Sequence, residues 1–207
     1  MPKKYDQIII RSLPNIPEVT SFSNISILIS NSLDKNNIKL KNKDVLVITQ
    51  KIISKAENRL IHKNNVIPSN RAIKLSKQIH KNAKLTQLIL DESKRIIKKK
   101  QGVVITETHH GFICANSGID QSNVPINYFC LLPINPDNSA KKIRLFLEKK
   151  YKIKISVIIS DTFGRPFRTG QTDVAIGVSG LSPLLNYKGK NDNYGRKINV
   201  TSIAIAD

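Results

Sequence analysis

The sequence predicts a domain in which short strands and helices alternate irregularly and which is neither a P-loop nor a Rossmann fold. Short apolar runs rich in Ile and Val predict buried strands, and apolar residues at helical spacing lie between them. No glycine-rich phosphate loop is present, although both excluded folds contain one. The chain has 207 residues, of which 40% are hydrophobic, and can bury the core of one good-sized domain or two small ones.

The N-terminal segment predicts a strand, a loop and a helix. An isoleucine run predicts a strand over residues 8–10, and two prolines predict an extended loop over residues 12–17. Apolar residues at helical spacing predict a helix over residues 22–33, with Ser21 or Ser23 as its N-cap.

A second strand, residues 45–49, runs directly into a polar turn that carries Lys51 and Lys55. If this turn is helical, both ammonium groups lie on one side, because side chains four residues apart share a helix face. That arrangement could hold phosphates. The alternative is two surface lysines in a lysine-rich chain.

The middle of the chain predicts two scaffold helices, over residues 69–82 and 84–98. Pro68 and Ser69 mark the start of the first helix. Residues 94–100, Lys-Arg-Ile-Ile-Lys-Lys-Lys, form the one patch-like cluster of positive charge. We interpret it as a solvated helix end.

A strand over residues 103–106 precedes His109 and His110. Neighbouring side chains on an extended segment point to opposite faces, so a metal shared by the two histidines is not expected. After a core segment at residues 112–115, a polar loop carries Asp120 and Asn123. It is either a ligand-binding loop or an Asx-type turn.

A helix over residues 140–149 leads to the segment on which the prediction of function depends. Residues 157–159 predict a buried strand that delivers Asp161 and Thr162 into a loop. Further polar residues follow before the next apolar run at 174–178, namely Arg165, Arg168, Gln171 and Asp173. A final strand is predicted over residues 198–205.

A carboxylate beside a hydroxyl, as at Asp161 and Thr162, suits a hard cation such as Mg²⁺ or Mn²⁺. Two nearby arginines, Arg165 and Arg168, suit phosphate or carboxylate oxygens. Together these residue types suggest phosphoryl chemistry. The alternative is a polar turn between two core strands.

Lys and Arg total 34 against 15 Asp and Glu, which gives a formal net charge of +19. This excess points to polyanionic partners, meaning nucleic acid, nucleotides or an anionic membrane surface. However, most of the charge is lysine spread along the chain, and only 5% of residues are aromatic. Stacking platforms for single-stranded nucleic acid are therefore scarce.

Cys114 and Cys130 lie in apolar surroundings, and we recognise no signal peptide, so we expect reduced core cysteines in a cytoplasmic protein. No apolar run approaches the roughly 18 residues of a membrane helix, so we expect no membrane partner.

Four separated motifs closely resemble the coenzyme F420-0:L-glutamate ligases, also called F420:γ-glutamyl ligases. They are Ser-Asp-Thr-Phe-Gly-Arg-Pro-Phe-Arg-Thr-Gly-Gln-Thr-Asp-Val-Ala-Ile-Gly-Val-Ser-Gly, Cys-Ala-Asn-Ser-Gly-Ile-Asp-Gln-Ser-Asn-Val, Thr-Gln-Lys-Ile-Ile-Ser-Lys-Ala-Glu and Leu-Pro-Asn-Ile-Pro. The resemblance runs from about residue 8 to the end, in the same order. It implies an α+β fold of mixed sheets with flanking helices over residues 1–207, and a homodimer.

The resemblance implies a GTP-dependent ligase that adds L-glutamate to the deazaflavin precursor F420-0, and then a second glutamate through a γ-linkage. An acyl phosphate would be the intermediate. Asp120 and Asp161 match ligands of one divalent cation, Mg²⁺ or Mn²⁺, and Thr162 matches a ligand of a second; the family also allows K⁺. The residues that match guanine-nucleotide contacts are Leu13, Pro14, Asn15, Ile16, Gln50, Lys51, Lys55 and Asn123.

Three further roles are expected on chemical grounds. Arg165 or Arg168 would bind an anionic group of the deazaflavin or of glutamate. Asp173 would orient a metal ligand or act as the base for the incoming amine.

The family's chains continue past the position of Asp207, into a segment that resembles part of the nucleotide site and supplies another metal ligand. The alternative function is an inactive, truncated homologue that binds nucleotides or RNA.

Overall fold

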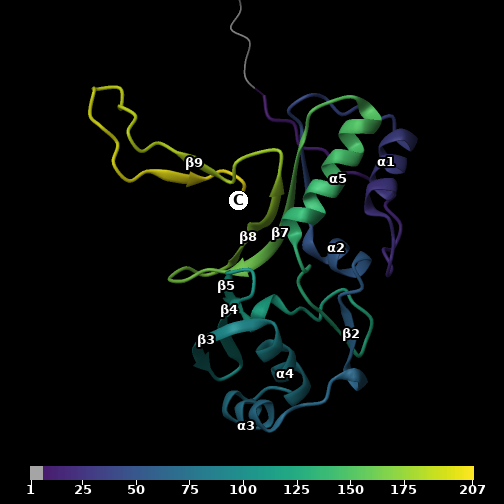
Figure 1. Ribbon diagram of the computed structural model, residues 1–207, viewed down its shortest axis with the longest axis vertical. Coiled ribbons are helices and arrows are strands. Elements are labelled where there is room, and N and C mark those ends of the chain that lie inside the picture. The colour runs from purple at the N-terminus through teal and green to yellow at the C-terminus, as the bar shows by residue number, and fades with distance from the viewer. Residues whose placement is uncertain (1–6) are drawn as a thin grey trace, which may run out of the picture.

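The computed structural model describes residues 7–207 and folds them around two apolar cores (Figure 1). The first core is packed between three helices and a three-stranded sheet. The second lies under a pair of helices and another three-stranded sheet. A pair of short strands extends away from both cores and forms an arm.

The first core contains the helices α1 (Ile25–Lys35), α2 (Gln50–Ala56) and α5 (Pro136–Tyr151) and the strands β1 (Val45–Thr49), β7 (Ser156–Gly164) and β8 (Gln171–Ser179). The strand β7 is central in this sheet, with β1 parallel on one side and β8 antiparallel on the other. Val157 and Ile159 of β7 are fully buried. This central strand therefore anchors the first core.

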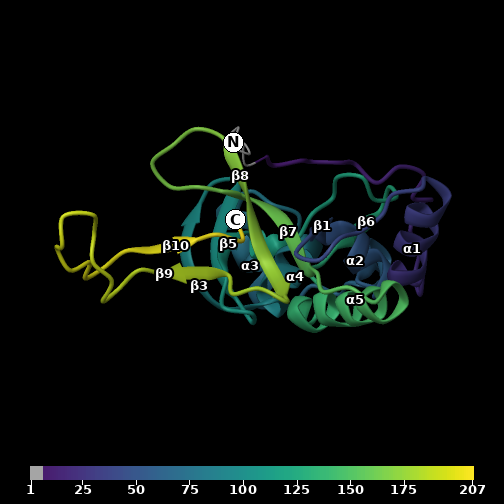
Figure 2. The ribbon, with the colours of Figure 1, turned by 90° about the horizontal axis from the view of Figure 1, so that it is seen from above.

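The second core contains α3 (Asn70–Ile79), α4 (Ala83–Asp91) and the antiparallel strands β3 (Ser93–Lys100), β4 (Val103–Thr108) and β5 (Ile113–Ala115). The antiparallel pair β2 (Leu60–His62) and β6 (Tyr128–Cys130) packs Phe129 into it. The short 3₁₀ helices are η1 (Lys63–Asn65) and η2 (Asn116–Gly118). The arm consists of β9 (Leu184–Asn186) and β10 (Ser202–Ala204) (Figure 2).

Side-chain caps begin the four longer helices. Asn24, Ser69, Asn82 and Asn135 each accept a hydrogen bond from a backbone N–H in the first turn of α1, α3, α4 and α5 respectively. In α5, Pro136 follows the cap at a position where its missing N–H costs little. Among residues 7–207, no helix has the length and apolar character needed to cross a membrane.

The predicted α+β class is confirmed, as is the strand at residues 45–49. The helical turn that carries Lys51 and Lys55 is also present as α2. The predicted helix at residues 22–33 is α1, but its N-cap is Asn24 rather than Ser21 or Ser23.

Other predicted elements are wrong or shorter than expected. Residues 8–10 are exposed and pair with no strand. The second scaffold helix ends at Asp91, and the basic run that we interpreted as a helix end lies in β3. There a turn at Gln101 and Gly102, with Gly102 at φ +79°, reverses the chain so that β3 pairs with β4. The final strand contains only Ser202–Ala204.

The closest packing between β8 and α5 occurs at Gly177. A Cβ atom there would lie 2.5 Å from the backbone carbonyl carbon of Pro136, which is too close for any side chain. We therefore expect Gly177→Ala to lower the free energy of unfolding by about 1–3 kcal/mol, measured by chemical denaturation. Gly164→Ala is the matched control, because no atom lies within 4 Å of a Cβ at that position. Equal losses in both variants would contradict this account of the interface.

Candidate active site

A lysine of α2 and an aspartate from the loop after η2 form an ion pair at the centre of the candidate site. Lys51 Nζ lies 2.7 Å from Asp120 Oδ2 and donates a hydrogen bond to Ser122 Oγ at 2.8 Å. The backbone N–H of Ser122 also donates to Asp120, at 2.7 Å. Asp120 is tied in turn to β6, because its backbone exchanges two hydrogen bonds with Cys130. The carboxylate is therefore held in one position.

Asp161 and Thr162 lie within β7 rather than in a loop, because β7 continues to Gly164 and pairs with β8 along its length. This corrects the prediction that the strand ends before Asp161. The register shifts between Ile159 and Ser160, where the buried half of β7 gives way to its polar half. Thr162 lies opposite Asp173 and donates to its carboxylate at 2.7 Å.

The environment of Asp161 raises its pKa to about 6. Burial is the largest cause, and the negative charges of Asp120 and Asp173 add to it. The positive charge of Lys51 acts in the opposite direction. For Asp120, burial also acts to raise the pKa, but hydrogen bonds from Lys51 and Ser122 outweigh it and hold the pKa below its ordinary value. The site thus contains one ionised carboxylate and one that titrates near neutral pH.

These carboxylates suit a hard divalent cation, which prefers oxygen ligands. A cation would also relieve the repulsion that contributes to the raised pKa of Asp161. Within residues 7–207, no three His, Cys, Asp or Glu side chains converge as a ready-made metal site. Asp120 and Asp161 would therefore hold a cation that keeps water or substrate oxygens as its other ligands, as Mg²⁺ usually does.

The predicted nucleotide contacts at residues 13–16 lie against α1 and β1. Leu13 and Ile16 line a cavity of about 250 Å³ whose other walls come from α1, β1 and α2. The Pro14 carbonyl accepts a hydrogen bond from Ser32 Oγ, and Asn15 Nδ2 donates to Asn36 Oδ1 at 3.1 Å. Side chains of α1 thus hold this loop in place beside an apolar hollow.

The remaining predicted nucleotide contacts have different environments. Gln50 is 1% exposed, and its side chain donates to the Leu131 carbonyl at 3.1 Å, so it links α2 to the end of β6. Lys55 is paired with Glu18 and does not share a partner with Lys51. Asn123 is exposed, in the loop that carries Asp120.

Arg165 and Arg168 lie in the hairpin loop between β7 and β8. Arg165 donates to the carbonyls of Thr169 and Gly170 in the same loop, at 3.1 and 3.3 Å. Arg168 is exposed, and the hairpin extends beyond the sheet (Figure 1).

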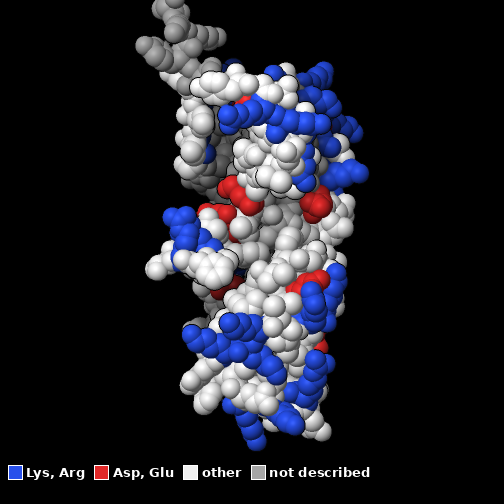
Figure 3. All heavy atoms as spheres, turned by 90° about the vertical axis from the view of Figure 1, so that its left-hand side faces the viewer, with Lys and Arg blue, Asp and Glu red and all other residues white. Residues whose placement is uncertain are grey.

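Figure 3 shows where the charges gather on one face of the molecule. Lys and Arg side chains cover its upper and lower parts, whereas Asp and Glu gather around its hollowed middle. A smaller group of Lys and Arg lies at the left edge of this middle region.

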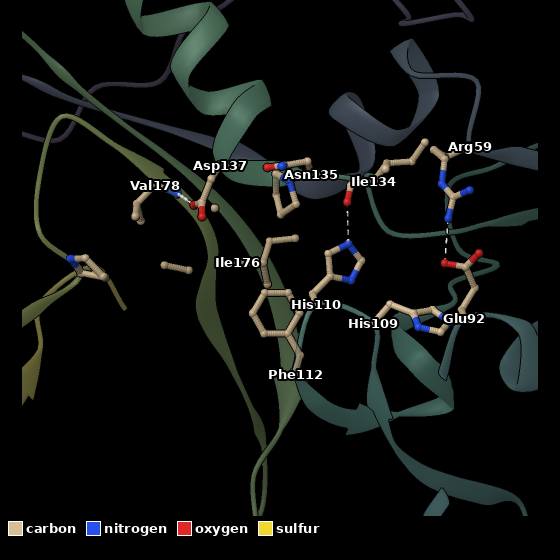
Figure 4. A pocket seen from close by; sticks show the side chains of 14 residues that line it. Arg59, Glu92, His109, His110, Phe112, Ile134, Asn135, Asp137, Ile176 and Val178 are labelled. Atoms are coloured by element: carbon tan, nitrogen blue, oxygen red, sulfur yellow. Dashed lines mark hydrogen bonds and ion pairs between the residues drawn. The ribbon is translucent and has the colours of Figure 1, made fainter. Parts of the chain in front are cut away.

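A second hollow, about 600 Å³ in volume, was missed by the sequence analysis (Figure 4). His109 and His110 line it, and they lie in the turn after β4 rather than on an extended segment as we predicted. His109 Nε2 contacts the Asp91 carbonyl and His110 Nε2 the Pro133 carbonyl, each at 2.8 Å. The adjacent histidines were the only signal for this site in the sequence.

A model of the family described as F420-0:Gamma-glutamyl ligase matches residues 14–207. Curated relatives described as coenzyme F420:L-glutamate ligase are similar. The relative from Methanocaldococcus jannaschii is 49% identical over 164 residues, which cover 79% of this chain and 66% of the relative. The relative from Methanococcus maripaludis strain S2 is 48% identical over 81% of this chain and 67% of its own. The relative from Methanothermobacter thermautotrophicus is 42% identical over 93% of this chain and 76% of the relative. The chain thus spans about two thirds of the length of the first two.

The raised pKa of Asp161 predicts a specific pH dependence of stability. The native carboxyl keeps its proton up to about pH 6, whereas its ordinary pKa is 3.8. Asp161 therefore lowers the stability of the fold progressively as the pH rises through this range, and the loss is complete above it. We expect Asp161→Asn to become progressively more stable than wild type between about pH 4 and pH 6. The difference should level off above pH 6, at on the order of 2 kcal/mol. Urea denaturation across this range measures it.

A paired comparison tests the cause of this effect. In a Lys51→Met background, the gain from Asp161→Asn should begin at the same pH but continue to rise to a higher pH and reach a larger value. The reason is that removal of the lysine removes a charge that lowers the native pKa of Asp161. A stability difference between Asp161→Asn and wild type that does not vary with pH would refute the assignment.

Proposed function

The chain belongs to the F420-0:gamma-glutamyl ligase family, and from this we propose that it is a GTP-dependent ligase that joins L-glutamate to F420-0 during biosynthesis of coenzyme F420. The observation that carries the proposal is the convergence of Lys51, Asp120 and Asp161 from three separate segments of the chain. The names of the similar proteins support the ligase class.

The proposed reaction has two steps. The γ-phosphoryl group of GTP passes to the lactyl carboxylate of F420-0, which gives GDP and an acyl phosphate. The amine of L-glutamate, having lost a proton, then attacks the acyl carbon, so that an amide forms and inorganic phosphate leaves. For a second addition, another GTP would phosphorylate the γ-carboxylate of the first glutamate. The amine of the second glutamate would then attack it, with release of inorganic phosphate.

The residues of the candidate site support defined parts of this chemistry. Lys51 would offset negative charge on the phosphates, and Asp173, hydrogen-bonded to Thr162, is the candidate base for the amine. Asp120 and Asp161 would hold one Mg²⁺ or Mn²⁺ ion and Thr162 would contact a second, with K⁺ as a further possible ion. Bound divalent cations neutralise a triphosphate and stabilise charge that develops during phosphoryl transfer.

The substrates would approach this centre from different sides. The loop at residues 13–16, with Gln50, Lys55 and Asn123, is the proposed guanine-nucleotide site, and the hollow beside Leu13 and Ile16 offers it an apolar wall. Arg165 or Arg168 would bind an anionic group of the deazaflavin or of glutamate. Neither arginine forms an ion pair among residues 7–207.

We further propose a cytoplasmic homodimer. Cys114 and Cys130 are both buried and free, as is usual in a reducing compartment. The arm carries exposed apolar side chains, including Val200 at 81% and Tyr194 at 91% exposure, which a second copy could cover.

The second candidate function is a non-catalytic nucleotide- or RNA-binding protein, which the net charge of +19 favours. Its distinguishing property would be binding to arbitrary RNA that weakens steeply with salt, because such binding depends on release of counterions. Metal-dependent selectivity for guanine nucleotides distinguishes the ligase.

The ligase proposal is tested with purified protein, GTP, Mn²⁺, L-glutamate and F420-0, with mass spectrometry of the deazaflavin. We expect glutamylated product and GDP. Asp161→Asn should lower the turnover by at least about 100-fold, because it removes a carboxylate ligand of the cation that would stabilise the reacting phosphates. Asp91→Asn, an exposed aspartate at the end of α4, is the matched control and should retain activity. Wild-type turnover in Asp161→Asn would exclude the proposed role of this residue, and no product from wild type would exclude ligase activity of this chain.

A further inference from the structure

The 600 Å³ cavity lies where the N-terminus of α5 and the strand β8 face the turn that carries His109 and His110 (Figure 4). Arg59 and Glu92 lie at one end of it in this view, and Asp137 and Val178 lie towards the other. Its volume is within the range of about 300–1,000 Å³ that is typical of sites for small molecules and cofactors.

The cavity adjoins the candidate active site. Ala175 lines it and directly follows Val174, the cross-strand neighbour of Asp161. The Phe112 ring, also in the lining, contacts the Phe163 ring edge-on at 6.2 Å between centroids. Because the sheet order is β1–β7–β8, Asp161 on the central strand lies between the hollow at β1 and this cavity at β8.

The one arginine of the cavity lining is already paired, and the carboxylate that forms no ion pair there, Asp137, is held by a backbone N–H. Arg59 forms an ion pair with Glu92 at 2.7 Å and donates to the Leu132 carbonyl at 2.8 Å. Asp137 accepts a hydrogen bond from the Val178 backbone N–H at 2.7 Å. Such a lining cannot neutralise a triphosphate or fully pair a zwitterionic amino acid, so it favours an occupant that is largely uncharged.

His110 provides a polar group that no protein atom satisfies. Its Nε2 contacts the carbonyls of Pro133 and Ile134 at 2.8 and 3.1 Å, so Nε2 carries the proton and donates. Its Nδ1 is buried and has no hydrogen-bond partner among residues 7–207. The imidazole is stacked on Phe112, with 5.6 Å between the ring centroids and 14° between the planes. Because His110 lines the cavity, an occupant with an N–H group would supply the donor that Nδ1 lacks.

We propose that this cavity binds the tricyclic ring of the deazaflavin acceptor, with an imide N–H of the ring directed at His110 Nδ1. A flat heterocycle with an imide N–H matches the volume, the aromatic wall and the unpaired acceptor. L-Glutamate is smaller and carries three charges, and GTP carries its charge on phosphates. This inference deepens the proposed function and rests on it, and it assigns the acceptor to the β8 side of Asp161.

The test uses the deazaflavin ring with its ribityl chain but without phosphate or lactate, and its own fluorescence reports binding. Two variants act by different means. Val178→Phe fills part of the cavity. His110→Gln keeps an N–H for the Pro133 carbonyl but removes the imidazole ring, and it replaces the Nδ1 acceptor by an amide oxygen in another position. We expect each to weaken binding of the ring at least about tenfold, and GTP binding to be unchanged. Val45→Phe, a matched change at an exposed position of β1 outside the cavity, should bind like wild type.

The outcomes separate this inference from the ligase proposal. Binding to wild type that both cavity variants weaken supports the cavity as the acceptor site, whether or not turnover is detected. If circular dichroism shows that Val178→Phe does not fold, binding of the ring by His110→Gln alone tests the inference. Binding of the ring that is equal in wild type and His110→Gln overturns the inference. So does glutamylation of F420-0 by a wild type that does not bind the ring, although the ligase proposal then stands. If the wild type shows neither binding of the ring nor turnover, both the inference and the ligase proposal are overturned.

Discussion

The strand β7 imposes the main constraint on this structure. Its first half is fully buried at Val157 and Ile159, between β1 and β8, and packs into the first core. The same strand continues through Asp161 and Thr162, so the burial that fixes the strand also withdraws a carboxylate from water. The raised pKa of Asp161 is a direct consequence of this continuity. Stability and the proposed chemistry thus depend on opposite halves of one strand.

The other charged groups of the site are held by contacts that link distant parts of the chain. Lys51 on α2 reaches Asp120 on the loop after η2, and Arg59 reaches Glu92 at the end of α4. The first pair joins α2, in the first core, to a loop whose Ile119 packs against the second core. Pairing of this kind offsets the desolvation of buried charges. Among the described residues it leaves Asp161 and Asp173 as the carboxylates of the cluster without a bonded cation. That imbalance is what a divalent cation or a protonated group would correct.

Short-range sequence patterns predicted the elements whose conformation depends mainly on residues close in sequence. The β-branched runs at residues 45–49 and 157–159 became strands, and the lysine-bearing turn became α2. The prediction of a helix end at residues 94–100 was wrong because the apolar spacing there fits a helix as well as a strand. Only the pairing with β4 makes this segment a strand. Residues 8–10 have strand-forming side chains but no strand beside them. The proximity of Lys51, Asp120 and Asp161 depends on tertiary contacts, so the sequence indicated their residue types and the resemblance indicated their grouping.

The His110 cavity could not be derived from the sequence, because its walls come from separate segments that meet only in the fold.

The central claim is that Asp161 on β7 is the point where nucleotide, cation and acceptor meet. Anomalous X-ray diffraction from crystals grown with Mn²⁺ and GDP tests it most directly. The account predicts a manganese peak between the carboxylates of Asp120 and Asp161, with the guanine beside residues 13–16. A peak elsewhere, with the pair of Lys51 and Asp120 intact and Asp161 without a ligand, would contradict it.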